Sequence, residues 1–240
     1  DYDYEILLIN DGSTDKTEEI CLSYKDNNSN IKDVFQENSG PGAARNEGLS
    51  QAGGEYLGFV DSDDFVDKNM FREMYSKAVE YNADVVQTGF RRVNKNDVII
   101  DSTKYVETFE VIEGSFNISF EYHKNKMMDY YMWTKLFKRK IIDDVRFPNF
   151  YYAEDQVFLA QVLSKCERVV VLPSVHYNQL MSENSLVRSP FSEKKLDNIR
   201  ASEWIYDYYS DEFCQLRSFV SERICLDTVR YYNDVKIINE

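Results

Sequence analysis

Short apolar runs alternate with helical spacing over the first 80 residues of the chain. Residues 4–9 (YEILLI) have the length and branching of a buried strand, and the run ends at the polar residues 10–13. Residues 34–35 (VF) mark a second short strand, and a third apolar run at residues 56–60 (YLGFV) leads into an acidic cluster. Helical patterns separate these runs, which predicts a largely parallel sheet with helices on its faces.

The pattern changes after residue 84, where two strand-like runs flank the polar turn NKND. We therefore expect an α/β fold with a mixed, mostly parallel sheet and a C-terminal helical extension. Residues 1–190 are interpreted as one domain with halves 1–90 and 91–190, and residues 191–240 as the extension. The elements expected in the second half are strands at 85–90, 92–100 and 168–172, helices at 115–123 and 154–164, and helical structure from about residue 192.

Composition narrows the function classes. The formal net charge of −14 argues against nucleic acid as a partner, because phosphate binding needs a basic surface. No apolar run approaches the roughly 18–20 residues that span a bilayer, and the N-terminus lacks signal-peptide features. We expect a cytoplasmic location, and peripheral contact with the inner face of a membrane stays open. The four cysteines are widely spaced, which favours reduced core thiols.

Carboxylates follow two of the predicted strands. Asp11 comes after the first, while Asp61, Ser62, Asp63 and Asp64 come after the run at 56–60. Because ligands bind at the carboxyl ends of the strands in such sheets, we expect these side chains at one edge. Neighbouring carboxylates repel one another unless a cation compensates, and Mg²⁺ or Mn²⁺ suits oxygen ligands. A solvated turn or a helix cap is an open alternative.

A glycine-containing turn precedes the acidic run. Residues 39–42 (SGPG) lead into a helical pattern, so backbone amides near Gly40 are suited to phosphate oxygens. Arg45 adds a cation that suits a diphosphate. An ordinary turn with a surface arginine explains the same residues.

Three motifs together resemble glycosyltransferase family 2, which has the GT-A fold. They are INDGSTD at 9–15, NSG with ARNEG between 38 and 48, and GEY with FVDSDD between 54 and 64. Two later segments, WTKLFKR at 133–139 and YAEDQVF at 152–158, resemble the bacterial cell-surface polysaccharide and teichoic-acid branch.

The resemblance implies an inverting, metal-dependent transfer from a nucleotide diphosphate sugar, with a UDP-sugar expected. The acceptor is expected to be a hydroxyl of a glycan, lipid-linked or polyol-phosphate molecule. Asp155 matches the general base, and Glu154 lies beside it to orient the base or the acceptor. An acidic first helical turn is the alternative for Asp155. The resemblance assigns Asp11, Ser13, Gly40, Arg45, Asp61 and Ser62 to the nucleotide sugar, and Asp63 and Asp64 to Mn²⁺ or Mg²⁺.

Several residues carry two interpretations each. Trp133 and its neighbouring tyrosines form either a sugar platform or core packing. Lys135, Lys138 and Arg139 either steer a phosphate-bearing acceptor or lie on a solvated helix face. His176 is either a further metal or phosphate contact or a polar partner.

Two wider questions also stay open. The family's usual first strand and helix have no counterpart before residue 4, so we expect the nucleotide side of the site to lack a strand. A catalytically inactive sugar-nucleotide-binding module or partner subunit is the alternative function.

Overall fold

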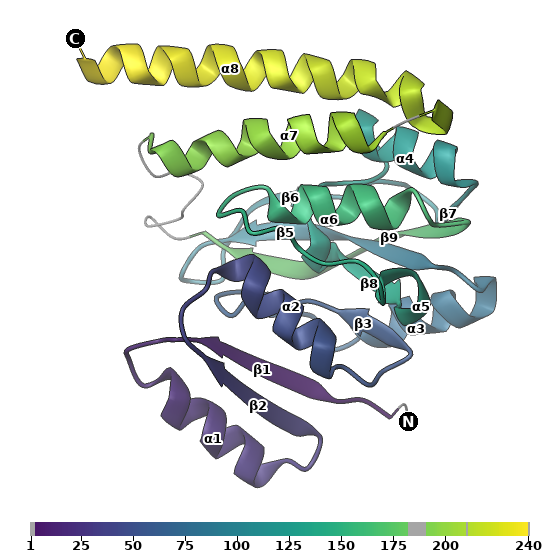
Figure 1. The fold of residues 1–240 in the computed structure, drawn as a ribbon. Coiled ribbons are helices and arrows are strands. Elements are labelled where there is room, and N and C mark those ends of the chain that lie inside the picture. The colour runs from purple at the N-terminus through teal and green to yellow at the C-terminus, as the bar shows by residue number, and fades with distance from the viewer. Residues whose placement is uncertain (1–2, 182–190, 210, 240) are drawn as a thin grey trace.

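The computed structural model describes residues 3–181, 191–209 and 211–239. Two sheets are flanked by helices, and the last two long helices are stacked above them (Figure 1). The elements up to residue 103 are β1 (Ile6–Asp11), α1 (Thr17–Asn27), β2 (Ile31–Gln36), α2 (Pro41–Gln51), β3 (Tyr56–Gly58), β4 (Phe65–Val66), α3 (Met70–Tyr81), β5 (Val85–Val93) and β6 (Ile99–Thr103). The later elements are β7 (Glu110–Glu113), α4 (Ser115–Lys124), the 3₁₀ helix η1 (Met132–Thr134), β8 (Lys135–Lys138), α5 (Arg139–Ile142), α6 (Glu154–Leu163), β9 (Arg168–Leu180), η3 (Glu193–Leu196), α7 (Asp197–Tyr208), η4 (Asp211–Leu216) and α8 (Arg217–Asn239).

The first sheet contains only two parallel strands, β1 and β2. Their register runs from Ile6 opposite Ile31 to Asp11 opposite Gln36, so Asp11 stands at the carboxyl end of its strand. Among the described residues β1 pairs with β2 alone, and apolar side chains of this unit, such as Tyr24, stay exposed. The strand expected at the start of the chain is therefore present as β1. Its edge opposite β2 has no partner strand in the described part of the chain.

The second sheet is mixed. Its central order is β3-β8-β5-β9-β4, with β6 paired to β5 and β7 paired to β9. β5 and β9 are parallel, whereas the other described ladders of this sheet are antiparallel. The mixed sheet is confirmed, but it has fewer parallel ladders than the alternation predicts. Tight turns such as residues 94–97 reverse the direction of the chain and so produce antiparallel neighbours. The alternation of strands and helices in the first 80 residues does not predict such turns.

The ends of two strands near the site differ from the sequence prediction. β3 ends at Gly58, so the acidic loop begins two residues earlier than the predicted strand end. β9 continues to Leu180, well past the predicted end at residue 172. Helix α3 buries Met74 and Ala78, whereas Val79 is 57% exposed because it lies off the buried stripe.

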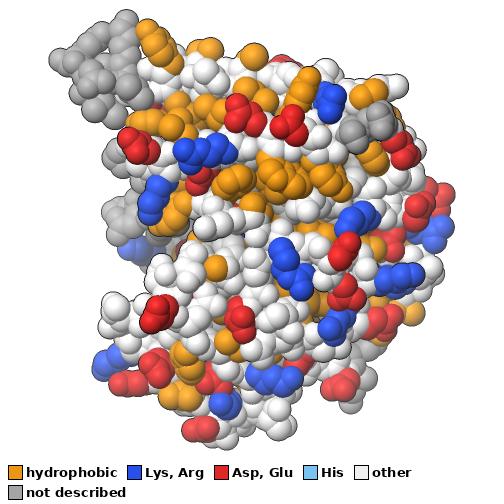
Figure 2. Space-filling model, viewed as in Figure 1, with side chains coloured by type: hydrophobic (Ala, Val, Ile, Leu, Met, Phe, Trp, Pro, Cys, Tyr) orange, Lys and Arg blue, Asp and Glu red, His pale blue; other side chains and the backbone are white. Residues whose placement is uncertain are grey.

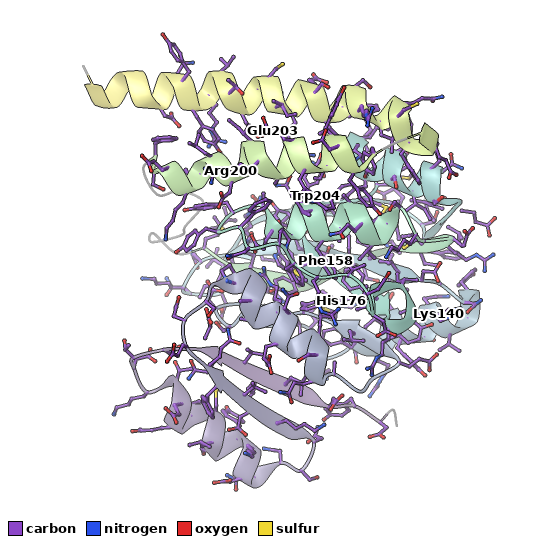
Figure 3. The ribbon with its side chains drawn as sticks, in the orientation of Figure 1. Lys140, Phe158, His176, Arg200, Glu203 and Trp204 are labelled. Carbon is purple, nitrogen blue, oxygen red and sulfur yellow. The ribbon has the colours of Figure 1, made fainter. Side chains whose placement is uncertain are left out.

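Hydrophobic clusters fill both faces of the second sheet. One contains Phe137, Phe147 and Phe158, and the rings of Phe147 and Phe158 are stacked with centroids 4.1 Å apart. Phe158 lies on the sheet-facing side of α6 (Figure 3). The other cluster, against α3, contains Phe90 and Trp133. Trp133 is 5% exposed, so core packing rather than a sugar platform describes it.

The C-terminal helices pack onto the sheet domain through α6. Ala201 and Ile205 of α7 share a buried cluster with Val157 of α6 and Val220 of α8. The predicted helical structure is confirmed, while the division at residue 190 stays a prediction. Hydrophobic side chains also gather at the surface over α7 and α8 (Figure 2). No helix in the described part of the chain is both long and apolar enough to cross a bilayer.

The cysteines are all free, but they do not form a core set. Cys166 is buried, Cys21 is half-buried, and Cys214 and Cys225 are exposed on the C-terminal helical region. The prediction of core thiols is therefore correct for Cys166 and wrong for the exposed pair. Helical spacing alone did not show which face of the final helices would be covered.

A buried ion pair lies beneath the sheet's aromatic cluster. Lys135 Nζ lies 2.5 Å from Asp129 Oδ1 and also donates to the carbonyl oxygens of Asp129 and Tyr131. Asp129 further accepts hydrogen bonds from the Thr134 and Tyr105 hydroxyls. Burial lowers the pKa of Lys135, and the Asp129 carboxylate opposes this shift. The prediction of an acceptor-steering or solvated Lys135 is thus wrong: it is fully buried, and it lies in a strand.

Replacing Lys135 tests the contribution of this pair to stability. We expect Lys135→Met to lower the free energy of unfolding by about 3–5 kcal/mol, because it leaves a buried carboxylate without its cation. Urea denaturation measures the change. Lys138→Met is the matched control on the same strand, since the Lys138 side chain is only partly buried and its Nζ donates to Asn82 at the surface, and we expect a change within about 0.5 kcal/mol. Equal stability of the two variants would contradict the prediction.

Candidate active site

Asp11 ties the first sheet to the start of α2. Its Oδ1 accepts hydrogen bonds from Gln36 Nε2 at 2.6 Å and from the Ser39 amide at 2.9 Å, while Oδ2 accepts from the Gly40 amide at 2.8 Å. The next residue, Gly12, has φ +74°, and a Cβ there would lie 2.7 Å from the Asn38 amide nitrogen. Asp11 therefore fixes the glycine-containing turn that the sequence assigns to the nucleotide sugar.

Helix α2 approaches the segment before α6 closely. A Cβ on Gly42 would lie 3.0 Å from the carbonyl oxygen of Pro148. Asn46 donates from Nδ2 to the Phe147 carbonyl at 3.0 Å and accepts the Phe147 amide at Oδ1 at 2.9 Å. Sequence reasoning quoted Asn46 within the ARNEG motif without giving it a role. The signal in the sequence that could have indicated this role is the side-chain amide of Asn46, which can donate and accept a hydrogen bond at the same time.

Arg45 lies between carboxylates from two distant segments. Nη1 lies 2.5 Å from Glu154 Oε1, and Nη2 lies 3.1 Å from Asp61 Oδ1. The guanidinium carbon also stands 5.8 Å from the centre of the Phe147 ring. Burial disfavours its charge, but nearby carboxylates outweigh that effect and raise the pKa of Arg45. The sequence placed this cation on a diphosphate, whereas here both terminal nitrogens contact protein carboxylates.

The acidic loop is anchored at both ends of its cluster. The Asp61 amide donates to the Tyr177 hydroxyl at 3.1 Å, and that hydroxyl donates to Asp64 Oδ2 at 2.8 Å. Asp64 Oδ1 accepts the Leu180 amide at 2.8 Å. Burial raises the pKa of Asp64 to about 6, against the opposing effect of these hydrogen bonds. Both Asp64 oxygens are thus already bonded to the protein.

Asp63 and Ser62 point outward between these anchors. Both residues are exposed, and Asp63 has no hydrogen bond or ion pair within the described part of the chain. No group of three or more metal-ligating side chains occurs among the described residues. A free carboxylate next to the occupied Asp64 fits a Mg²⁺-type ion that takes one or two protein ligands and completes its shell with phosphate oxygens and water. The geometry favours Asp63 over Asp64 as the ligand.

Glu154 and Asp155 form the first turn of α6. The preceding residue, Ala153, is buried and has φ +60°, a left-handed conformation unusual for alanine. Glu154 faces Arg45, and the Gln156 amide donates to Asp155 Oδ1 at 2.8 Å. Burial, followed by repulsion from Glu154, raises the pKa of Asp155 to about 7, while Arg45 opposes the shift. A carboxylate with a pKa near neutrality is suited to accepting a proton.

Two predicted candidates lie outside this cluster. Ser13 is exposed, and its amide donates to Asn10 Oδ1 at 2.9 Å. His176, labelled in Figure 3, bonds to Glu73 at 2.6 Å and lies 3.5 Å from Asp67. This arrangement matches the polar-partner interpretation of His176.

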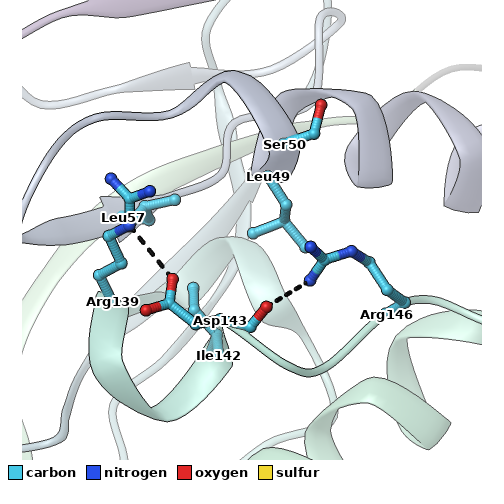
Figure 4. A pocket seen from close by; sticks show the side chains of 7 residues that line it. All are labelled: Leu49, Ser50, Leu57, Arg139, Ile142, Asp143 and Arg146. Carbon is cyan, nitrogen blue, oxygen red and sulfur yellow. Dashed lines mark hydrogen bonds and ion pairs between the residues drawn. The ribbon is translucent and has the colours of Figure 1, made fainter.

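Two hollows flank α2. One, of about 380 Å³, lies along its first half and is lined by Ser39, Ala43, Asn46, Phe147, Pro148 and Asn149. The other, of about 260 Å³, lies at its C-terminal end beside α5 (Figure 4). There Arg139 bonds to Asp143, and Arg146 bonds to the Asp143 carbonyl. Of these two hollows, the first is lined by Phe147, whose ring faces the Arg45 guanidinium. Arg45 in turn contacts the carboxylates of Asp61 and Glu154.

Comparison with known proteins gives a consistent family. The model described as glycosyl transferase family 2 matches residues 1–146. Glycosyltransferase GlyA of Streptococcus pneumoniae serotype 4 is 31% identical over 192 residues, which cover 77% of this chain and 27% of that protein. The poly(ribitol-phosphate) beta-glucosyltransferase of Bacillus spizizenii is 28% identical over 187 residues, which cover 76% of this chain and 28% of that protein.

A solved structure shares the fold. S. aureus TarS residues 1–349, in complex with UDP-GlcNAc, matches with a TM-score of 0.71 at 23% identity, covering 95% of this chain and 64% of that one. The predicted GT-A fold is thereby confirmed. Together with the family match over residues 1–146, these findings show that the chain belongs to glycosyltransferase family 2.

Proposed function

We propose that this chain transfers a sugar from a nucleotide diphosphate sugar to an acceptor hydroxyl in the synthesis of a cell-surface polysaccharide, with inversion at the anomeric carbon. The observation that carries the proposal is the ion pairing of Arg45 with both Asp61 and Glu154. This pairing places the acidic loop beside the helix that bears Asp155. A donor-side loop and a candidate base thus share one site.

Asp155 is the proposed general base. In-line attack forms a bond between the acceptor oxygen and the anomeric carbon while the bond to the diphosphate oxygen breaks. The acceptor proton passes to the Asp155 carboxylate, and the electron pair leaves with the nucleoside diphosphate. Glu154 stays ion-paired to Arg45, so its role is to fix the start of α6 and the orientation of Asp155.

The donor side is assigned to Asp61, Ser62 and Asp63, together with the turn that Asp11 organises. Asp63 would hold Mn²⁺ or Mg²⁺, which when bound neutralises charge on the departing diphosphate. The backbone amides of Ser39 and Gly40 already donate to Asp11, so that turn shapes the donor pocket rather than offering free amides. The UDP-GlcNAc in the TarS structure supports a UDP-sugar as the donor.

The proposed acceptor is based on the acceptor named for one relative. The Bacillus spizizenii relative acts, by its name, on poly(ribitol-phosphate), which supports a polyol-phosphate or similar glycan acceptor. A location at the cytoplasmic face of the membrane follows as part of the same proposal.

Removing the proposed base tests catalysis directly. Asp155→Asn keeps the acceptor of the Gln156 hydrogen bond but cannot take a proton, so we expect UDP release from UDP-GlcNAc with Mn²⁺ to fall about 10²–10⁴-fold. Asp143→Asn removes an exposed carboxylate elsewhere and should leave the rate within about twofold. Unchanged turnover in Asp155→Asn would overturn the assignment of Asp155 as the base, whereas a wild-type chain that binds UDP-GlcNAc without turnover would be a binding module.

The same substitution has a predictable effect on stability. The pKa of Asp155 is near 4 in the unfolded chain, and burial raises it to about 7 in the folded chain. Between these values the folded chain binds more protons, so its free energy of unfolding falls as pH rises. We expect Asp155→Asn to be more stable than the wild type at pH 8, by about 1–3 kcal/mol, and equal below pH 4. Urea denaturation at both pH values measures this; a destabilised variant at pH 8 would contradict it.

Asp63 and the metal are tested separately. Asp63→Ala removes the free carboxylate without breaking any described hydrogen bond, so its thermal midpoint should match the wild type. We expect the midpoint shift produced by Mn²⁺ with UDP to be largely lost, because only ligands of the folded state raise stability. A full Mn²⁺-dependent shift in Asp63→Ala would refute the assignment.

A further inference from the structure

Tyr177 lies directly beneath the acidic loop. It belongs to β9, where it pairs with Phe90 of β5 and with Val66 of β4. Its side chain is fully buried, yet its hydroxyl reaches the two ends of the acidic cluster.

One hydroxyl group connects the first and last aspartates of the cluster. It accepts the Asp61 amide at 3.1 Å and donates to Asp64 Oδ2 at 2.8 Å. Since Leu180 also donates to Asp64, two residues of β9 hold the loop. Asp63 lies between these fixed points, so its direction depends on them.

The hydroxyl is itself fixed by ring packing. The Tyr177 ring stacks on Trp133 with centroids 4.2 Å apart, and Trp133 stacks on Tyr131 at 4.6 Å. Phe90 contacts Trp133 edge to face. A ring enclosed in this way has little rotational freedom, so its hydroxyl is a preorganised anchor.

We propose that Tyr177 is a positioning residue that holds Asp63 in the direction required for donor binding. This role rests on the proposed function, because it acts through the metal and nucleotide side of that site. Tyr177→Phe removes the hydroxyl and keeps the stacked ring, so it isolates the contact from the fold.

A ligand-free measurement reads the position of the loop. In Tyr177→Phe the Asp61 amide loses its acceptor, so hydrogen exchange across residues 57–66 should rise at least about fivefold. Tyr209→Phe is the matched control. Tyr209 is equally buried, and its hydroxyl bonds to His123 on the C-terminal side of the molecule. Exchange at residues 57–66 should stay at the wild-type rate in that variant.

A binding measurement reads the consequence. We expect Tyr177→Phe to weaken calorimetric binding of UDP with Mn²⁺ about tenfold, and to raise the KM for UDP-GlcNAc more than it lowers kcat. Tyr209→Phe should stay within about twofold in both, at a comparable loss in thermal midpoint.

Each outcome decides one claim. Unchanged exchange in Tyr177→Phe, or unchanged binding despite faster exchange, overturns the positioning role. Equal weakening in both variants also overturns it, because a general loss of stability then suffices. A wild-type chain that does not bind UDP with Mn²⁺ overturns the proposed function and this role with it, whereas the exchange result still reports whether Tyr177 holds the loop.

Discussion

The Arg45 guanidinium is the contact on which the arrangement of the site depends. Asp61 and Glu154 come from segments more than 90 residues apart, and both are at least partly buried. Carboxylates that approach one another in this way repel, and the cost grows as water is removed. A cation between them turns the repulsion into attraction, so α2 joins the acidic loop to α6. Asn46 adds a second link between α2 and the Phe147 backbone.

Support for the acidic loop comes from below, in layers of different chemistry. The hydroxyl of Tyr177 bonds to the loop, the Tyr177 ring stacks on Trp133, and the buried Lys135–Asp129 pair contacts the neighbouring Tyr131. Tyr131 belongs to both lower layers, because its ring stacks on Trp133 while its carbonyl accepts from Lys135. A polar site thus rests on a largely apolar base that contains one compensated charge pair.

Local patterns in the sequence predicted much of this. Apolar runs predicted the early strands with carboxylates at their carboxyl ends, and helical spacing predicted α6. The resemblance to family 2 supplied the pairing of distant motifs. Long-range packing was beyond these signals. Lys135 lies in a charged segment that reads as solvated, and only the fold shows that β8 is central and covered on both faces. Tyr177 was missed because a tyrosine in a strand predicts burial but not which backbone its hydroxyl reaches.

The backbone at Ala153, where α6 begins, has an unfavourable conformation. Alanine at φ +60° lies in a sparsely populated backbone region, at a cost on the order of 1–3 kcal/mol. Glu154 follows this residue directly and forms an ion pair with Arg45 of α2. The attraction within that ion pair offsets the cost of the backbone conformation. The direction of the first turn of α6 is therefore set by its partner on α2 and not by local backbone preference alone.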